Sequence, residues 1–178
     1  MKRVSRLIAL TIAALVALAT GGRALAETSA RDVEALSKAS LIYIATVRKD
    51  GNQSTPAPVW FTTTDDHRIL IQTGPTTWKV KRVRRGSPMI VWIGDLGGPA
   101  FIAKAAITRE PAILQRIVDD FPKRYLEARL GFHKPSLESF EKGDRVAIEI
   151  TPVRDLPKGF SSNPGTPAPS LEAEPRSR

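Results

Sequence analysis

Apolar residues along the chain gather in short runs, separated by turns that are rich in glycine, proline and aspartate. Runs of this length and composition predict β-strands. Six of them occur, at residues 41–47, 58–63, 69–73, 89–93, 101–108 and 145–153. The first is apolar on both faces, whereas the last alternates along its length. Strands with two apolar faces and short turns between them indicate a small barrel.

Two stretches have the pattern of helices that cover such a barrel. Residues 29–39 carry apolar positions at helical spacing behind a capping box that begins at Ser29. After the fifth strand, Pro111 opens a second helical stretch, in which Pro122 is expected to start a further helix that Gly131 ends. The predicted fold class is therefore mainly β with flanking helices, built on a six-stranded barrel.

The first 26 residues have the pattern of a secretory signal peptide. Cationic residues precede an apolar run over residues 7–19, and an Ala-Leu-Ala cleavage site ends at Ala26. The apolar run is shorter than the roughly 20 residues that a membrane span needs. We expect Sec-type export and a mature chain that begins near Glu27, is periplasmic or secreted, and has no membrane span.

The remaining sequence predicts one domain and a tail. Residues 158–178 are rich in proline and serine with almost no large apolar side chain, so we expect them to be disordered. Residues 27–157 then form a single domain of ordinary size. The chain has no cysteine, which rules out disulfides and thiolate metal sites. An exported domain without disulfides is stabilised by its core or by a second copy, which favours a homodimer.

Positive charge is concentrated in one segment. The formal net charge is +9, and it falls to +5 when the four cations of residues 1–26 are removed. Five of the remaining cations lie within residues 79–85. A local excess of this kind indicates an anionic ligand more than a generally basic surface.

The segment 73–85 combines hydroxyl groups with these cations. Thr73 ends the third predicted strand, and Thr77 precedes a basic helix on which Lys79 and Arg82, three positions apart, share a face. Free backbone amides and cationic side chains at such a place suit a phosphate group. The alternative interpretation is a solvated basic helix face.

Other kinds of site have less support. No aromatic residues alternate with the cations, and an exported protein is a poor partner for nucleic acid, so we expect no nucleic-acid binding. His67 and His133 lack a second histidine or carboxylate at metal-binding spacing, so no metal site is predicted. No GxSxG motif occurs, and the glycines of residues 94–98 fit a wide hairpin turn. We assign no catalytic residue.

The ordered set of these features resembles the split β-barrel flavin-binding superfamily, which includes pyridoxamine 5'-phosphate oxidases and F420-dependent reductases. The set comprises a strand with Pro-Val-Trp-Phe at residues 58–61, the TxxxTxKxxR spacing of residues 73–82, and Pro88 before the next strand. The resemblance covers about residues 36–157. It implies a split β-barrel of the FMN-binding type, and a homodimer with two cofactor sites at the subunit interface.

The resemblance also implies roles for individual residues. The hydroxyls of Thr73 and Thr77 and the ammonium group of Lys79 correspond to the phosphate-binding groups of the family, with Arg82 as a further contact. The flavin ring of the family lies against the preceding strand, and Trp60 and Trp78 flank the expected pocket. The candidate cofactor-binding residues are Pro58, Val59, Trp60, Thr73, Thr77, Trp78, Lys79 and Arg82.

These implications favour an exported FMN-binding oxidoreductase or electron-transfer protein, in which the flavin supplies the chemistry. Residues 54–61 lack the arginine and lysine that true pyridoxamine phosphate oxidases carry there, so we do not expect vitamin B6 oxidation. An F420-dependent reductase is a second hypothesis, with Lys81, Arg84 and Arg85 as extra contacts for the acidic tail of F420. A non-enzymatic protein that binds haem or another small ligand is a third.

Overall fold

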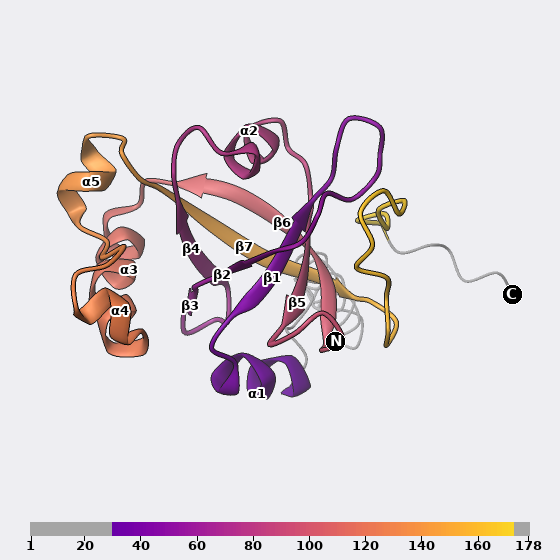
Figure 1. The fold of residues 1–178 in the computed structure, drawn as a ribbon, viewed down its shortest axis with the longest axis horizontal. Helices are drawn as coiled ribbons and strands as arrows, with labels where there is room; N and C mark the ends of the chain where they lie inside the picture. Colours follow the sequence, from indigo (N-terminus) through magenta and orange to yellow (C-terminus); the bar gives the residue numbers. More distant parts are fainter. Residues whose placement is uncertain (1–29, 173–178) are drawn as a thin grey trace, which may run out of the picture.

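The computed structural model of the protein describes residues 30–172 (Figure 1). The expected signal peptide at residues 1–26, Ser29 of the expected capping box, and residues 173–178 of the expected tail lie outside the described residues. None of the helices between residues 30 and 172 has the length and the apolar character that a membrane crossing requires.

Within the described residues, seven antiparallel strands form one curved sheet and five helices pack around it (Figure 1). The strands are β1 (Ile42–Thr46), β2 (Ala57–Val59), β3 (Thr62–Thr63), β4 (Ile69–Thr73), β5 (Met89–Ile93), β6 (Ala100–Thr108) and β7 (Val146–Asp155). The helices are α1 (Ala30–Lys38), α2 (Trp78–Arg84), α3 (Pro111–Arg124), α4 (Leu126–Arg129) and α5 (Leu137–Glu141). The order of strands in the sheet is β2-β1-β5-β6-β7-β4-β3.

The two edge strands of the sheet, β2 and β3, are neighbours in the chain. The sequence predicts one strand over residues 58–63, but the chain leaves the sheet at Trp60 and Phe61, and β2 pairs with β1 while β3 pairs with β4. The hydroxyl of Tyr125 accepts from the N–H of Phe61 and donates to its carbonyl oxygen, both at 2.8 Å. This contact takes Phe61 out of the strand ladder. The predicted split-barrel class is thus confirmed, with seven strands in place of six.

The inner face of the sheet holds the main core. Facing strands bring Ile44 opposite Val91 and Ile71 opposite Ile148, and Phe61 lies among them with no exposed surface. Burial of each such side chain contributes about 1.5–3 kcal/mol. The core therefore does the stabilising that disulfides do in other small domains, in a chain that has no cysteine.

Helix α3 packs against β3 and β4. The sequence predicts a new helix at Pro122, but this is wrong: α3 continues to Arg124, and the chain becomes extended at Tyr125 (φ −122°, ψ 120°). Ile117 and Phe121 are buried one turn apart on α3, and their packing holds the helix through the proline. The helix ends where the hydroxyl of Tyr125 is tied to the edge of the barrel.

Residues 158–172, which the sequence assigns to a disordered tail, pack on the outside of the barrel (Figure 1, yellow). We call this segment the C-terminal strap. Phe160 and Leu171 of the strap cover the outer face of the sheet around Trp92, whose ring centroid lies 6.4 Å from that of Phe160. Because β5 is buried along its whole length, its outer face needs such a cover. The strap as a whole is polar and rich in proline, but its two large apolar side chains lie where they can cover this face.

Candidate functional site

The connection from β4 to α2 is held by threonine hydroxyls. Oγ1 of Thr77 accepts from the N–H of Val80 at 3.5 Å, which caps α2, and donates to the carbonyl oxygen of Gly74 at 3.1 Å. Oγ1 of Thr73 lies 3.5 Å from the same hydroxyl. Val80 and Val83 are buried, so α2 presents Lys79 and Arg82 away from the core.

A hollow of about 360 Å³ lies between α2 and the far end of β1. We call it the basic hollow. Three cationic side chains line it, and its lining contains no carboxylate. Its lining residues are Ile44, Thr46, Arg48, Ser54, Thr55, Ala57, Thr77, Trp78, Lys79 and Arg82. None of the ion pairs found between residues 30 and 172 involves Arg48, Lys79 or Arg82.

The cations of the basic hollow lie in an unfavourable environment. Burial holds the pKa of Lys79 below its usual value. The pKa of Arg82 is also lowered, first by burial and then by the like charges of Arg48 and Arg85, while Asp50 acts in the opposite direction. Nη1 of Arg82 donates to Oγ1 of Thr46 at 2.8 Å, which fixes the guanidinium group at the wall. A bound anion would offset both the burial and the repulsion.

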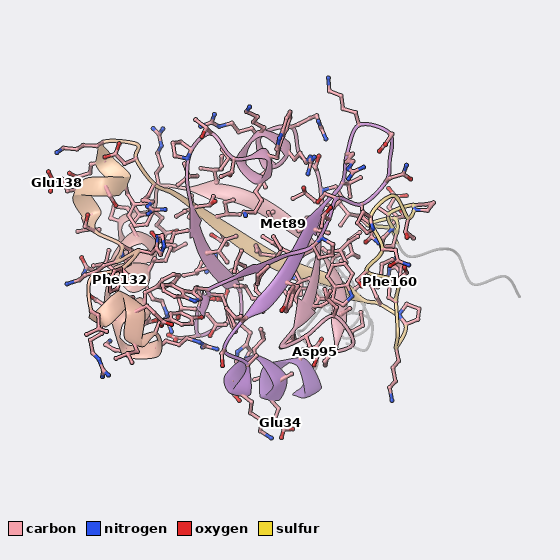
Figure 2. The ribbon with its side chains drawn as sticks, in the orientation of Figure 1. Glu34, Met89, Asp95, Phe132, Glu138 and Phe160 are labelled. Atoms are coloured by element: carbon pink, nitrogen blue, oxygen red, sulfur yellow. The ribbon has the colours of Figure 1, made fainter. Side chains whose placement is uncertain are left out.

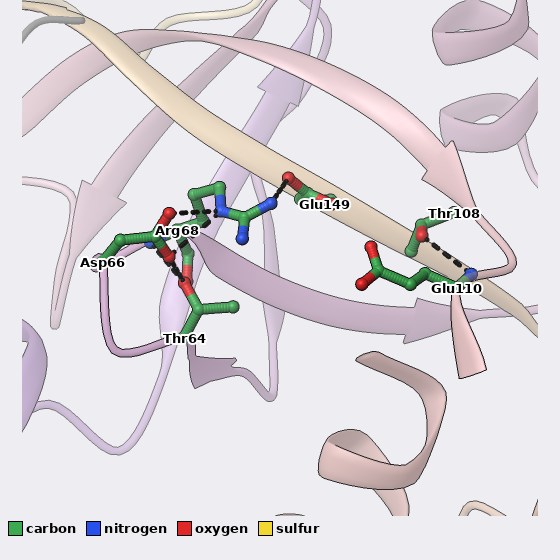
Figure 3. A network of polar contacts seen from close by, with 6 residues as sticks. All are labelled: Thr64, Asp66, Arg68, Thr108, Glu110 and Glu149. Atoms are coloured by element: carbon green, nitrogen blue, oxygen red, sulfur yellow. Dashed lines mark hydrogen bonds and ion pairs between the residues drawn. The ribbon is translucent and has the colours of Figure 1, made fainter. Parts of the chain in front are cut away.

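Elsewhere in the described chain, a partly buried arginine has acidic partners. Arg68 lies between Asp66 and Glu149 and forms ion pairs with both (Figure 3). The hydrogen bond with Glu149 is the main reason why the pKa of Arg68 is raised, and the hydroxyl of Thr64 is the main reason why that of Asp66 is lowered. This network joins the β3–β4 hairpin to β7. The contrast indicates that the basic hollow is suited to an external anion.

A second hollow, of about 420 Å³, adjoins the first, and we call it the apolar hollow. Its walls include β2, the end of β4 and Phe121 of α3. Its lining residues are Leu41, Pro58, Val59, Trp60, Gln72, Thr73, Gly74, Phe121, His133 and Arg145. The ring of Trp60 stacks on Tyr125, with centroids 4.6 Å apart and planes 8° apart. The wall is therefore a rigid aromatic surface.

One polar atom at the apolar hollow has no partner. Nε2 of Gln72 donates to the carbonyl oxygen of His133 at 2.9 Å, which fixes the orientation of the amide. Oε1 of Gln72 is shielded from solvent and accepts no hydrogen bond from any described residue. A buried acceptor of this kind costs free energy unless a donor reaches it.

The structure divides the eight candidate residues between the two hollows. Those that line the apolar hollow are Pro58, Val59, Trp60 and Thr73, and those that line the basic hollow are Thr77, Trp78, Lys79 and Arg82. Ala57 lines the basic hollow, and the next residue, Pro58, lines the apolar hollow. The hydroxyl of Thr77 in the basic hollow lies 3.5 Å from that of Thr73 in the apolar hollow, so the two hollows adjoin.

Trp78 lies at the rim of the basic hollow. It is 68% exposed, and Nζ of Lys81 lies 4.6 Å from its ring centroid. Lys81 itself is exposed and does not line the hollow. Lys79 and Arg82, which the sequence places on one face of the helix, both line the hollow.

Sequence reasoning missed several lining residues. Arg48, Ser54 and Thr55 come from the loop between β1 and β2, which lines the hollow together with α2 through contacts that no local pattern reveals. His133, for which the sequence predicts no metal site, is exposed and lines the apolar hollow together with Arg145. Its backbone is left-handed (φ 52°), an uncommon conformation for a residue other than glycine. No group of metal-binding side chains comes together among the described residues.

Comparison with known proteins identifies the family to which this fold belongs. The pyridoxamine 5'-phosphate oxidase family matches residues 29–154. No curated protein matches the chain. Among solved structures, a conserved hypothetical protein of Mycobacterium tuberculosis is similar, with a TM-score of 0.54 and 21% identity over 76% of this chain and 88% of that one.

Two further structures share the fold. A candidate pyridoxamine 5'-phosphate oxidase of Listeria innocua has a TM-score of 0.52 and 19% identity, over 70% of this chain and 92% of that one. The haem storage protein HutZ of Vibrio cholerae has a TM-score of 0.51 and 13% identity, over 67% of this chain and 86% of that one. The family match spans the whole barrel together with both hollows, and the chain belongs to the pyridoxamine 5'-phosphate oxidase family.

Proposed function

We propose that this protein is an exported, homodimeric FMN-binding protein that acts as an oxidoreductase or electron carrier. The observation that carries the proposal is the basic hollow, in which Arg48, Lys79 and Arg82 form no ion pair with any described residue. The apolar hollow beside it supports an aromatic ring on the same ligand. A flavin mononucleotide carries both groups.

The phosphate of FMN fits the basic hollow. A phosphate monoester carries about −1.5 to −2 charges at neutral pH, together with three acceptor oxygens. Lys79 offers three N–H donors, and Arg48 and Arg82 offer planar guanidinium groups. Arg82 is held in place by Thr46, so its donors need little ordering on binding. The hydroxyl of Thr77 already donates to the chain, and its part is to fix the turn.

The ring system of FMN fits the apolar hollow. Leu41, Val59 and Phe121 offer apolar contacts, and Trp60 is braced by Tyr125. The unpaired Oε1 of Gln72 suits a ring that carries an N–H donor, as the flavin ring does. Bound flavin supplies hydride and electron chemistry, which needs no acid or base from the chain. The residues of this hollow position the ring and exclude water from one side of it.

Vitamin B6 oxidation is not part of the proposal. Residues 54–61 carry no arginine or lysine. Pro58 and Val59 of this segment face the apolar hollow, so that wall offers no cation to a second phosphate group. The substrate of the proposed enzyme is thus expected to differ from a pyridoxine phosphate.

Dimerisation and export complete the proposal. Leu126, Leu130 and Phe132 are 55%, 66% and 65% exposed, and a second copy would remove such apolar surface from water. Sedimentation of the mature chain is expected to give twice the monomer mass. Export predicts that the protein recovered from the periplasm or the medium begins near Glu27, which N-terminal sequencing checks.

The decisive test is a titration of the purified mature protein with FMN. Binding is expected to change flavin fluorescence and absorption, and Lys79→Ala is expected to weaken it. Absence of binding at concentrations well above those of free cellular flavin would reject the proposal. Competition with F420 separates the two flavin-like cofactors, because the acidic tail of F420 would engage Lys81, Arg84 and Arg85.

A second candidate function is the binding of haem without turnover. The observation in its favour is His133, which lines the apolar hollow and offers an imidazole that could ligate iron. The fold shared with HutZ agrees with this option. Haem binding with a Soret shift that His133→Ala abolishes, together with no FMN binding, would favour it over the flavin proposal.

A further inference from the structure

We propose that the C-terminal strap, residues 158–172, is a positioning element for the basic hollow and holds Arg48 and Arg82 in their anion-binding arrangement. The inference rests on the proposed function for the identity of the ligand. The strap lies outside residues 29–154, which the family match covers. Figure 1 shows it beside the loop between β1 and β2.

The strap is bonded to that loop through Gln53, which has no exposed surface. Nε2 of Gln53 donates to the carbonyl oxygens of Ser161 at 2.8 Å and Asn163 at 2.7 Å. The backbone of Gln53 donates to Thr166 at 2.9 Å and accepts from Gly165 at 3.1 Å. These four hydrogen bonds join one loop residue to four residues of the strap.

The other side of the same loop is the wall of the basic hollow. Ser54 follows Gln53 directly, and its Oγ accepts from the N–H of Thr46 at 3.0 Å. Oγ1 of Thr46 accepts from Nη1 of Arg82 at 2.8 Å. Arg48, on the loop itself, lines the hollow. A continuous path of covalent and hydrogen bonds therefore runs from the strap to two of the three cations.

Bonds within the hairpin close the loop: the N–H of Arg48 donates to the carbonyl oxygen of Asn52 at 2.8 Å, and the N–H of Ser54 donates to that of Thr46 at 2.9 Å. Among the described residues, the backbone hydrogen bonds that tie residues 48–53 to other segments all go to the strap, and Gly51 at the tip of the loop is left-handed (φ 81°). A further bond runs from the N–H of Ala168 in the strap to the carbonyl oxygen of Gly51 at 3.0 Å. Without the strap, Arg48 would have to be ordered when the anion binds. Ordering a long side chain on binding weakens affinity by about two- to tenfold.

Two substitutions loosen the strap without touching the hollow. Phe160→Ala removes the contact with Trp92. Gly165→Val strains the strap turn, because Gly165 has φ 84° and an added Cβ meets no atom within 4 Å, so the effect is confined to the backbone. Leu137→Ala is the matched control, since Leu137 is 37% exposed, lines neither hollow and precedes Glu138, which Figure 2 labels on the opposite side of the molecule from Phe160.

The experiment compares wild type and these three full-length variants by amide hydrogen exchange and by titration with inorganic phosphate and with FMN. Circular dichroism confirms that each variant is folded, and Gly165→Val serves if Phe160→Ala does not fold. We expect faster exchange in residues 48–55 and affinities about two- to tenfold lower in both strap variants, with no change in Leu137→Ala.

Unchanged exchange in residues 48–55, or unchanged phosphate affinity despite faster exchange, overturns the positioning role. The FMN arm is judged separately. If wild type binds phosphate but not FMN, the proposed function fails, while the exchange and phosphate measurements still decide the role of the strap.

Discussion

Lys79→Ala is the substitution that most directly tests anion binding in the basic hollow. The Lys79 ammonium group is partly buried, lines the hollow and has no acidic partner within residues 30–172, so its charge is available to a ligand. A charge-assisted hydrogen bond contributes roughly 1.5–3 kcal/mol. Since 1.4 kcal/mol corresponds to a factor of ten, FMN affinity is expected to fall about ten- to a hundredfold.

The same substitution is expected to leave the fold intact. In the unliganded protein, burial disfavours the charged form of Lys79 and lowers its pKa, so removal of the amine relieves a cost. The free energy of unfolding without ligand should change by less than about 0.5 kcal/mol. Flavin fluorescence titration gives the affinity, and urea unfolding of the ligand-free protein gives the stability.

Lys81→Ala is the matched control. Lys81 is on the same helix and loses the same side chain, but it is exposed beside Trp78 and does not line the hollow. Arg85 is a poorer control because its guanidinium group donates to the carbonyl oxygen of Val47, at the base of the β1–β2 loop. Equal FMN affinity in wild type and Lys79→Ala, or a large loss of stability without loss of binding, would refute the assignment of Lys79.

Three further predictions concern pH and the frame of the site. Phosphate affinity should fall as the pH rises through the lowered pKa of Lys79, because the anion is bound by the protonated amine. Lys79→Arg should shift that loss of affinity to higher pH, and equal pH profiles for wild type and Lys79→Arg would contradict this. Tyr125→Phe leaves the buried N–H and carbonyl of Phe61 without partners and should lower the free energy of unfolding by roughly 2–4 kcal/mol in urea titrations. Gly98→Ala should destabilise the β5–β6 hairpin by more than about 2 kcal/mol in the same assay, because its Cβ would stand 2.1 Å from a backbone oxygen of β5. Gly97→Ala, whose Cβ would be 3.2 Å from a side-chain oxygen, should be milder, and equal effects would count against the argument.

Local pattern was sufficient for much of the fold. The strands at residues 69–73 and 89–93 have the predicted bounds, because each is a short apolar run between clear turn residues. Thr77 caps the basic helix as its place before Lys79 suggests. These features depend only on neighbours in the chain.

Features that depend on tertiary contacts could not be predicted from the sequence. Nothing local shows that the chain leaves the sheet at Phe61, because its partner Tyr125 is 64 residues away. The packing of the strap could not be predicted for the same reason, because its contact with Trp92 and its hydrogen bonds to Gln53 join segments that are distant in the chain. Arg48 was missed as a site residue because the loop that carries it is positioned by that strap.

The most direct test of the central claim is the affinity of the mature protein for FMN compared with riboflavin, which lacks only the phosphate. If Arg48, Lys79 and Arg82 bind that phosphate, FMN should bind at least about tenfold more tightly in wild type, and Lys79→Ala should shrink the difference. Equal affinities for FMN and riboflavin in wild type would contradict the account.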